Sequence, residues 1–206
     1  MPPDFSRIRF LKSAQGPADF PPEAGPEIAF AGRSNAGKSS ALNALAGQGA
    51  LARVSKTPGR TQLINFFELE NGARLVDLPG YGYAKVPAAM REQWRELIER
   101  YVEDRRTLRG LVVLMDARHP LSDLDRQLLA WLARLGRPVH IVLTKADKLT
   151  RAAAAATLAS VRRSLPAMHG EAGVQLFSAP AKMGREELLA RMQRWLGEDA
   201  AEEGKA

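Results

Sequence analysis

Short apolar runs alternate along this chain with segments in which apolar residues recur every three or four positions. The first pattern predicts buried strands, and the second predicts amphipathic helices. Strands are predicted at residues 27–31, 62–70, 74–77, 108–116, 138–144 and 174–177. Helices are predicted at residues 40–46, 88–106, 123–135, 151–164 and 186–196. This order is typical of a mostly parallel sheet with helices on both faces.

One pair of strands departs from the parallel arrangement. Asn71-Gly72 separates residues 62–70 from residues 74–77, and Asn-Gly between two strand patterns favours a tight hairpin. We therefore predict an α/β fold with a mostly parallel six-stranded sheet, one antiparallel edge strand and helices on both faces. Ligands of such sheets bind at the carboxyl ends of the strands, which is where the polar motifs of this chain fall.

The segment between the first predicted strand and the first predicted helix has the pattern of a phosphate-binding loop. Residues 32–39 read GRSNAGKS, a complete match to G-x-x-x-x-G-K-[ST]. The glycines allow backbone N–H groups to face a polyphosphate, and the N-terminus of the following helix adds partial positive charge. Lys38 is expected to reach the β- and γ-phosphates, and the Ser39 hydroxyl is expected to bind Mg²⁺. The motif indicates a P-loop NTPase.

Three residues after this loop fit the γ-phosphate end of a nucleotide. Asp77 ends a predicted strand within DLPG, where a carboxylate can hold Mg²⁺ through a water and the Gly80 N–H can contact a γ-phosphate. Thr61 can close over the nucleotide and ligate Mg²⁺, or it is an ordinary residue at the start of a strand. The expected catalytic residues are Lys38, Thr61 and Gly80, and the expected metal ligands are Ser39, Thr61 and, through water, Asp77.

A second group of residues fits the base. Residues 144–147 read TKAD and end another predicted strand. Asp147 can accept hydrogen bonds from guanine N1–H and the 2-amino group, an arrangement that adenine does not offer, and the stem of Lys145 can lie over the base. Ser178 and Ala179 follow the last predicted strand and fit a backbone contact to guanine O6. These residues favour guanine over adenine.

The stretches GRSNAGKS, TPGRTQ, DLPGYGYAKV, TKAD and FSA, in this order, resemble the EngB (YihA/YsxC) family of bacterial GTPases, in the Era-like group of translation-factor-related GTPases. The resemblance covers about residues 25–197. It implies a Ras-like G domain that binds GTP or GDP with Mg²⁺ and changes conformation at residues 48–61 and 78–90. The candidate nucleotide contacts are Gly32, Arg33, Ser34, Asn35, Ala36, Gly37, Lys38, Ser39, Gly59, Arg60, Thr61, Gln62, Leu63, Asp77, Leu78, Pro79, Gly80, Thr144, Lys145, Ala146, Asp147, Phe177, Ser178 and Ala179.

Three residues bear on rate and selectivity. Ras-like proteins place a water-orienting Gln directly after D-x-x-G, whereas this chain has Tyr81, so we predict slow hydrolysis that a partner stimulates. Thr144 stands where many members of the wider group carry Asn, so guanine selection depends more on Asp147. Asn35 occupies the position that holds K⁺ in related potassium-activated GTPases; the alternative is that it only stabilises the loop turn.

Composition restricts the class of protein and its partners. The chain contains no cysteine, which excludes disulfides, zinc–thiolate sites and a cysteine nucleophile. The net charge is +7, and residues 48–67 hold basic residues but no acid, which favours an anionic partner such as RNA. No apolar run approaches the roughly 20 residues that span a bilayer, and the N-terminus lacks a signal-peptide core, so we expect a cytoplasmic protein. We expect an N-terminal extension at residues 1–24, one G domain at residues 25–197 and an acidic, disordered tail at residues 198–206.

Three functions are open at this point. The resemblance implies a GTPase that docks on the large ribosomal subunit or its precursor, in agreement with the positive charge. The family is also associated with septation, so the alternative is a GTPase of cell division, acting directly or through ribosome supply. The third is a metabolic kinase, against which TKAD and the absence of a lid-like insertion argue. RNA contacts are expected from Arg7, Arg9, Lys12, Arg53, Lys56 and Lys85, and we expect a monomer without a membrane anchor.

Overall fold

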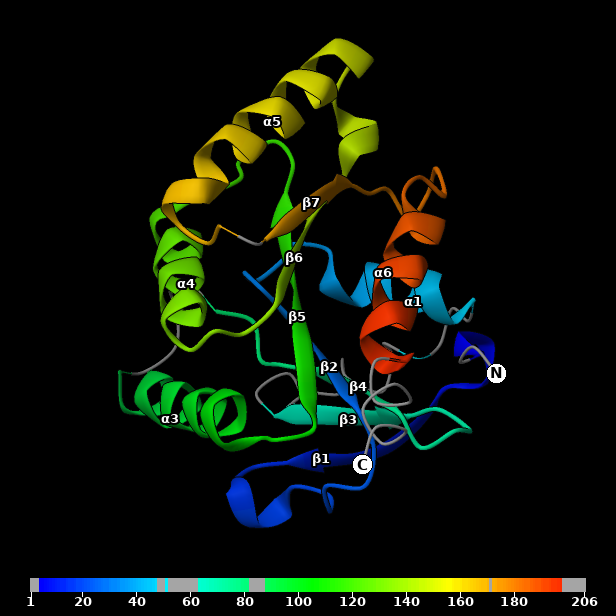
Figure 1. Cartoon of the computed structure of the whole chain (residues 1–206), viewed down its shortest axis with the longest axis vertical. Coiled ribbons are helices and arrows are strands. Elements are labelled where there is room, and N and C mark those ends of the chain that lie inside the picture. Colours follow the sequence, from blue (N-terminus) through cyan, green and yellow to red (C-terminus); the bar gives the residue numbers. More distant parts are fainter. Residues whose placement is uncertain (1–3, 48–50, 52–62, 82–87, 171, 198–206) are drawn as a thin grey trace, which may run out of the picture.

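The computed structural model describes residues 4–47, 51, 63–81, 88–170 and 172–197. Within them, seven strands form one sheet in the order β1-β3-β4-β2-β5-β6-β7, with β1 and β7 at its two edges (Figure 1). The strands are β1 (Arg9–Ala14), β2 (Glu27–Gly32), β3 (Ile64–Glu68), β4 (Arg74–Asp77), β5 (Leu108–Asp116), β6 (Val139–Thr144) and β7 (Gly173–Leu176). The α-helices are α1 (Lys38–Ala46), α3 (Ala88–Asp104), α4 (Asp123–Arg134), α5 (Arg151–Ser164) and α6 (Arg185–Gly197).

Four short 3-10 turns complete the regular structure of the described residues. They are η1 (Phe5–Arg7), η2 (Pro17–Asp19), η4 (Ala146–Lys148) and η5 (Leu165–Ala167). Of the helices in this part of the chain, none combines the length and the apolar composition that crossing a membrane requires.

The sheet has one strand more than the sequence predicted. Strands β2, β4, β5, β6 and β7 run parallel, and β3 is antiparallel to β4 across the predicted Asn71-Gly72 hairpin. The prediction of six strands with the antiparallel strand at the edge was wrong, because β1 pairs antiparallel with β3 and lies outside it. A register shift between Phe10 and Lys12 interrupts the two-residue alternation of β1, so the strand is hard to recognise in the sequence.

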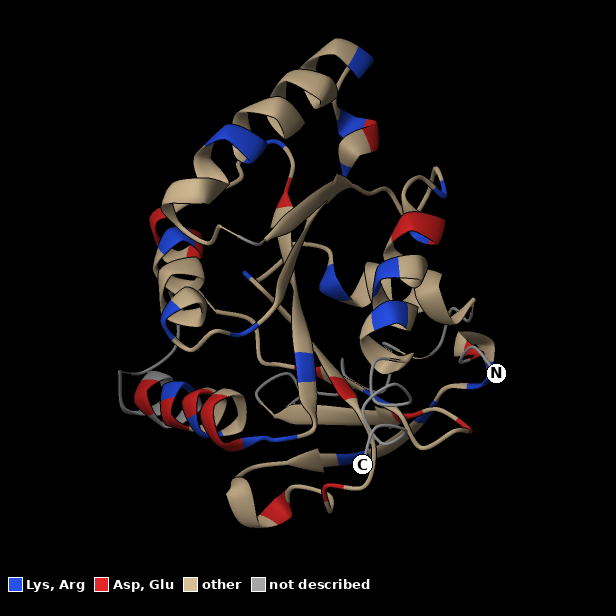
Figure 2. Cartoon of the chain, in the orientation of Figure 1, with Lys and Arg blue, Asp and Glu red and all other residues tan. Residues whose placement is uncertain are grey.

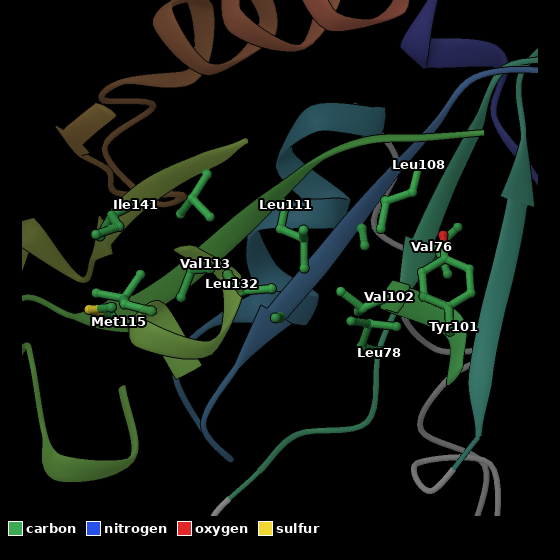
Figure 3. Packing of buried hydrophobic residues seen from close by; sticks show 14 of the residues in the cluster. Val76, Leu78, Tyr101, Val102, Leu108, Leu111, Val113, Met115, Leu132 and Ile141 are labelled. Atoms are coloured by element: carbon green, nitrogen blue, oxygen red, sulfur yellow. The ribbon is translucent and has the colours of Figure 1, made fainter. Parts of the chain in front are cut away.

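Helices cover both faces of the sheet, as predicted. Successive residues of β5 point to opposite faces, as the pleat requires. Leu111 and Val113 pack in a cluster with side chains of α3, α4 and α5, part of which Figure 3 shows. Val112 and Leu114 pack in a second cluster with side chains of α1 and α6. The sheet is therefore the middle layer of three.

A buried ionic cluster fixes the chain that leads into β2. Glu27 is fully buried and accepts hydrogen bonds from Arg105 (2.6 and 2.9 Å), from the Tyr101 hydroxyl (2.9 Å) and from Arg74 (3.3 Å). Arg105 and Arg74 also donate to the carbonyls of residues 21 and 22, at 2.8 and 2.6 Å. Burial, followed by the carboxylate of Glu27, raises the pKa of Tyr101, so this hydroxyl remains a donor. The cluster joins the start of β2 to β4 and to the end of α3.

The parallel strands bring distant residues to one edge of the sheet. Phe30 in β2 pairs with Asp77 at the end of β4, and Asp116 at the end of β5 pairs with Thr144 at the end of β6. The loop that follows β2 begins at this edge. The fold therefore collects the predicted motifs at the carboxyl ends of the strands.

Candidate functional site

A cavity of about 340 Å³ lies at the carboxyl edge of the sheet. It is lined by residues 33–40 and by Leu63, Asp77, Leu78, Gly80 and Lys145. Residues from the loop after β2, the end of β4 and the end of β6 thus face one space. The sequence predicted that the phosphate loop, Asp77 and Lys145 of the base motif would lie close together.

Local geometry explains why the loop after β2 needs its glycines. Gly37 has a φ of 89°, and a Cβ built there would lie 3.3 Å from Cβ and Oγ1 of Thr144. A Cβ at Gly32 would lie 2.8 Å from the carbonyl oxygen of Leu114. α1 begins at Lys38 with no side-chain cap, so its first backbone N–H groups are left for another acceptor. Such an N-terminus is a favourable place for a phosphate.

Lys38 and Asp77 form an ion pair inside the cavity. Their side chains are only 13% and 6% exposed, so the two charges face each other in a largely dry environment. The sequence assigned them separate partners, a phosphate for Lys38 and a hydrated Mg²⁺ for Asp77. The pair places a cation and an anion side by side, which suits a ligand that brings a polyphosphate together with a metal ion.

The oxygen donors near the loop are suited to Mg²⁺. Ser39 and Asp77 both line the cavity and offer a hydroxyl and a carboxylate, the hard oxygen ligands that this ion prefers. No group of three or more His, Asp or Glu able to hold a metal occurs in the part of the chain that the structure describes. A site with one carboxylate and one hydroxyl relies on water and substrate phosphates for its other ligands, as Mg²⁺ sites commonly do.

The TKAD residues join the base end of the site to the loop. Lys145 has a φ of 58°, and its Nζ donates to the carbonyl of Asn35 (2.7 Å) and to Asp116 (2.9 Å). The Ser178 hydroxyl donates to Asp147 at 2.6 Å, and this hydrogen bond holds the pKa of Asp147 below its usual range. Asp147 is therefore ionised at neutral pH and able to accept hydrogen bonds.

The first and third residues of TKAD have supporting roles. The Thr144 side chain is buried, with its hydroxyl 2.6 Å from the carbonyl of Ala36 and 3.1 Å from that of Met115. The hydroxyl is thus committed to the backbone of the loop and of β5. Ala146 donates from its backbone N–H to the carbonyl of Phe177 (3.1 Å), which holds the segment containing Ser178 and Ala179 next to Asp147.

The structure adds two acidic residues that sequence reasoning missed. Asp116 accepts from Lys145 and from Arg118 (2.7 and 2.9 Å), and the pKa of Asp116 is held well below its usual range, first by the hydrogen bond from Arg118. Asp125 accepts from the Tyr81 hydroxyl at 2.8 Å. The position of Asp116 at a strand end was a usable indication. Nothing in the sequence indicated that Asp125 contacts Tyr81, because the spacing of Ser122 and Asp125 indicates only a helix cap.

Part of the predicted site lies outside the described residues. This applies to Gly59, Arg60, Thr61 and Gln62, and to the candidate RNA contacts Arg53, Lys56 and Lys85. Of the remaining nucleotide candidates, residues 33–39, Leu63, Asp77, Leu78, Gly80 and Lys145 line the cavity, whereas Asp147, Phe177, Ser178 and Ala179 are not among its lining residues. The RNA candidates Arg7, Arg9 and Lys12 lie at or next to the edge strand β1, away from the cavity.

Comparison with known proteins agrees with this geometry. A family described as "50S ribosome-binding GTPase" matches residues 27–145. "Probable GTP-binding protein EngB" of Aromatoleum aromaticum is 58% identical over 195 residues, 95% of this chain and 90% of that protein. The protein of the same name from an Azoarcus species is 57% identical over 201 residues, 97% and 96% of the two chains.

Solved structures share the fold. The crystal structure of a probable GTP-binding protein engB has a TM-score of 0.69 at 24% identity, and the match covers 84% of this chain and 99% of that chain. A single-residue variant of Aquifex aeolicus Era, bound to GDP.AlF4-, has a TM-score of 0.61 at 20% identity, with 82% of this chain and 56% of that one covered.

Proposed function

This chain belongs to the EngB family of GTP-binding proteins, and we propose that it acts in assembly of the large ribosomal subunit, by docking in its GTP form on rRNA or a precursor particle. The family and the P-loop GTPase fold establish a GTP-binding protein with GTPase activity. The proposal adds the partner, the place of action and the roles of individual residues. A cytoplasmic location follows from the proposed partner.

The observation that carries the site assignment is the single cavity shared by Lys38, Asp77, Gly80 and Lys145. Lys38 would leave its ion pair with Asp77 and bind the β- and γ-phosphates. Asp77, through a water, would then hold Mg²⁺ together with the hydroxyls of Ser39 and Thr61. Mg²⁺ held there would supply positive charge that stabilises the charge developing on the phosphates during hydrolysis.

We expect intrinsic hydrolysis to be slow, and the contacts of Tyr81 support this expectation. Hydrolysis requires a water to attack the γ-phosphorus while the bond to the β–γ bridging oxygen breaks and GDP leaves. Tyr81 occupies the position of the water-orienting Gln of Ras-like proteins, yet its hydroxyl donates to Asp125 in α4. Tyr81 is also not among the residues that line the cavity. A group that orients the water would then have to come from the bound partner.

Charge supports an RNA-containing partner. The net charge is +7, and binding to a dense polyanion is driven largely by charge. Figure 2 shows basic residues on α5, whereas α3 and α6 carry both acidic and basic residues. Arg7 and Arg9 make exposed ion pairs with Glu70 and Glu68, both at 3.0 Å. Exposed pairs of this kind are weak, so RNA phosphates can compete for both arginines.

The test is co-sedimentation of the purified protein with large subunits and with precursor particles, on sucrose gradients at physiological salt. We expect comigration with a non-hydrolysable GTP analogue and little with GDP. Lys38→Ala is the control, because it lacks the phosphate contact and should not comigrate in either condition. Absence of comigration with both nucleotides, precursor particles included, would contradict the ribosomal proposal and favour the cell-division alternative.

A further inference from the structure

We infer that Tyr81 is a positioning residue that holds Gly80 at the wall of the phosphate cavity and thereby sets the preference for GTP over GDP. The inference rests on the proposed contact between the Gly80 N–H and the γ-phosphate. It does not depend on the identity of the macromolecular partner.

Backbone hydrogen bonds fasten the chain on both sides of Gly80. Before it, Leu78 N–H donates to the carbonyl of Phe30 at 3.0 Å. After it, Tyr81 N–H donates to the carbonyl of Gly32 at 3.3 Å, and Ser34 N–H donates to the carbonyl of Tyr81 at 3.0 Å. Only Pro79 and Gly80 lie between these attachments, so the path of Gly80 along the cavity is narrowly defined.

The side chain of Tyr81 provides a third attachment. Its hydroxyl donates to Oδ1 of Asp125 at 2.8 Å. Oδ2 of Asp125 accepts from the backbone N–H (2.9 Å) and the hydroxyl (2.7 Å) of Ser122, the N-cap residue of α4. Asp125 is 1% exposed, so the acceptor is fixed by the helix cap and shielded from water. Burial and the nearby carboxylate raise the pKa of Tyr81, which therefore remains a hydrogen-bond donor.

These attachments act on GTP through Gly80. Gly80 lines the cavity and Tyr81 does not, so Tyr81 affects the nucleotide through the peptide that precedes it. A peptide that is ordered before the ligand arrives saves the entropy of ordering it on binding. This saving in entropy favours binding of GTP, because the γ-phosphate of GTP can accept from the Gly80 N–H. GDP lacks the γ-phosphate and gains nothing from the ordered peptide. Loss of the Tyr81 attachment should therefore weaken GTP selectively.

The test compares Tyr81→Phe with wild type by equilibrium binding of a fluorescent non-hydrolysable GTP analogue and of fluorescent GDP, with Mg²⁺. Tyr81→Phe removes only the hydroxyl that donates to Asp125 and keeps the ring. We expect the Kd of the analogue to rise about three- to tenfold, which matches the net contribution of one typical hydrogen bond. The Kd of GDP should change less than about twofold. An equal change for both nucleotides, or none for either, overturns the inference.

Two further variants separate the attachment from helix capping. Ser122→Ala removes the cap hydroxyl but keeps the backbone N–H at residue 122 that holds Oδ2 of Asp125, and it keeps the bond from Tyr81 to Oδ1. It should therefore lower thermal stability and leave the ratio of the two Kd values unchanged. Asp125→Ala should lower the preference for GTP, and adding Tyr81→Phe to it should cause no further change in the ratio. A ratio that shifts with Ser122→Ala as much as with Tyr81→Phe would assign the effect to the helix and contradict the inference.

Gly80→Pro distinguishes failure of this inference from failure of the assignment on which it rests, because proline lacks the backbone N–H. If Gly80→Pro leaves the ratio of the two Kd values unchanged, the contact of the Gly80 N–H with the γ-phosphate is refuted, and the role of Tyr81 with it. If Gly80→Pro lowers the preference for GTP while Tyr81→Phe does not, Gly80 keeps its role and only the positioning by Tyr81 is refuted.

Discussion

Replacing Glu27 by Gln should destabilise the protein strongly, although Glu27 lies at the end of the sheet opposite to the nucleotide site. The carboxylate is fully buried and accepts two hydrogen bonds from Arg105, one from Tyr101 and one from Arg74. Gln removes the charge and turns an amide donor toward guanidinium donors. Removing one partner of a buried ion pair costs about 3–5 kcal/mol, so we expect the free energy of unfolding to fall by that amount.

The assay is urea unfolding followed by circular dichroism, together with the melting temperature. For a chain of this length, about 3–5 kcal/mol corresponds to a fall of roughly 6–20 °C in Tm. Glu70→Gln is the matched control, because its 3.0 Å pair with Arg7 is exposed on the surface, and we expect no measurable change. A loss below about 1 kcal/mol for Glu27→Gln would refute the reasoning, since it would show that Arg105 and Tyr101 find other partners at little cost.

Two further predictions concern acid stability and monovalent cations. Burial is the largest cause that lowers the pKa of His140 from its ordinary value of 6.5 to about 4. Between these two values the unfolded chain binds a proton more readily than the folded chain. The free energy of unfolding should therefore fall as the pH drops from about 6.5 to about 4. The full loss in the free energy of unfolding is about 3 kcal/mol. His140→Gln should flatten the pH dependence of the free energy of urea unfolding in that range, and a pH dependence as steep as that of wild type would contradict the prediction. If Asn35 helps to hold K⁺, GTP hydrolysis should be faster in KCl than in NaCl of equal ionic strength, and Asn35→Ala should abolish the difference. Equal rates for wild type in the two salts would exclude the K⁺ role.

Elements with a clear local pattern of apolar residues could be predicted from the sequence almost to the residue. The near-continuous apolar run of β5 was predicted at residues 108–116, and the structure has Leu108–Asp116. Ser122 and Asp125 have the spacing of a capping box before the apolar residues of α4, and in the structure the two are bonded reciprocally. These features depend on neighbouring residues alone, so a local pattern is sufficient to find them.

Features that depend on distant residues could not be predicted. The strand β1 has a bulge and one exposed face, and it is defined by pairing with β3, more than 50 residues later along the chain. The apolar spacing of α4 groups Leu124 with Leu128 and Trp131 on one side of the helix and so predicts that Leu124 is packed. In the structure Leu124 is 43% exposed, while the neighbouring Asp125 is buried. Asp125 is buried because Tyr81, 44 residues earlier, supplies a donor for its second oxygen. No local pattern carries that information.

The motifs gave the members of the site but not their contacts. The sequence predicted that Lys38, Asp77 and Lys145 would meet, because parallel strands end at the same edge of a sheet. It did not predict that Lys38 would pair directly with Asp77, or that Asp116 would hold Lys145. Such contacts depend on rotamers and on the register between strands, which composition and spacing leave undetermined.

The central claim is that the loop of residues 32–39 binds the phosphates and that Asp147, in the segment after β6, selects guanine. The most direct test is the relative affinity for GTP and XTP of wild type and of Asp147→Asn. The xanthine ring carries an oxygen where guanine carries the 2-amino group, so an amide at this position should reverse the preference. We predict a large loss of GTP affinity with a gain for XTP. Full GTP affinity retained by Asp147→Asn would contradict the assignment of the base site.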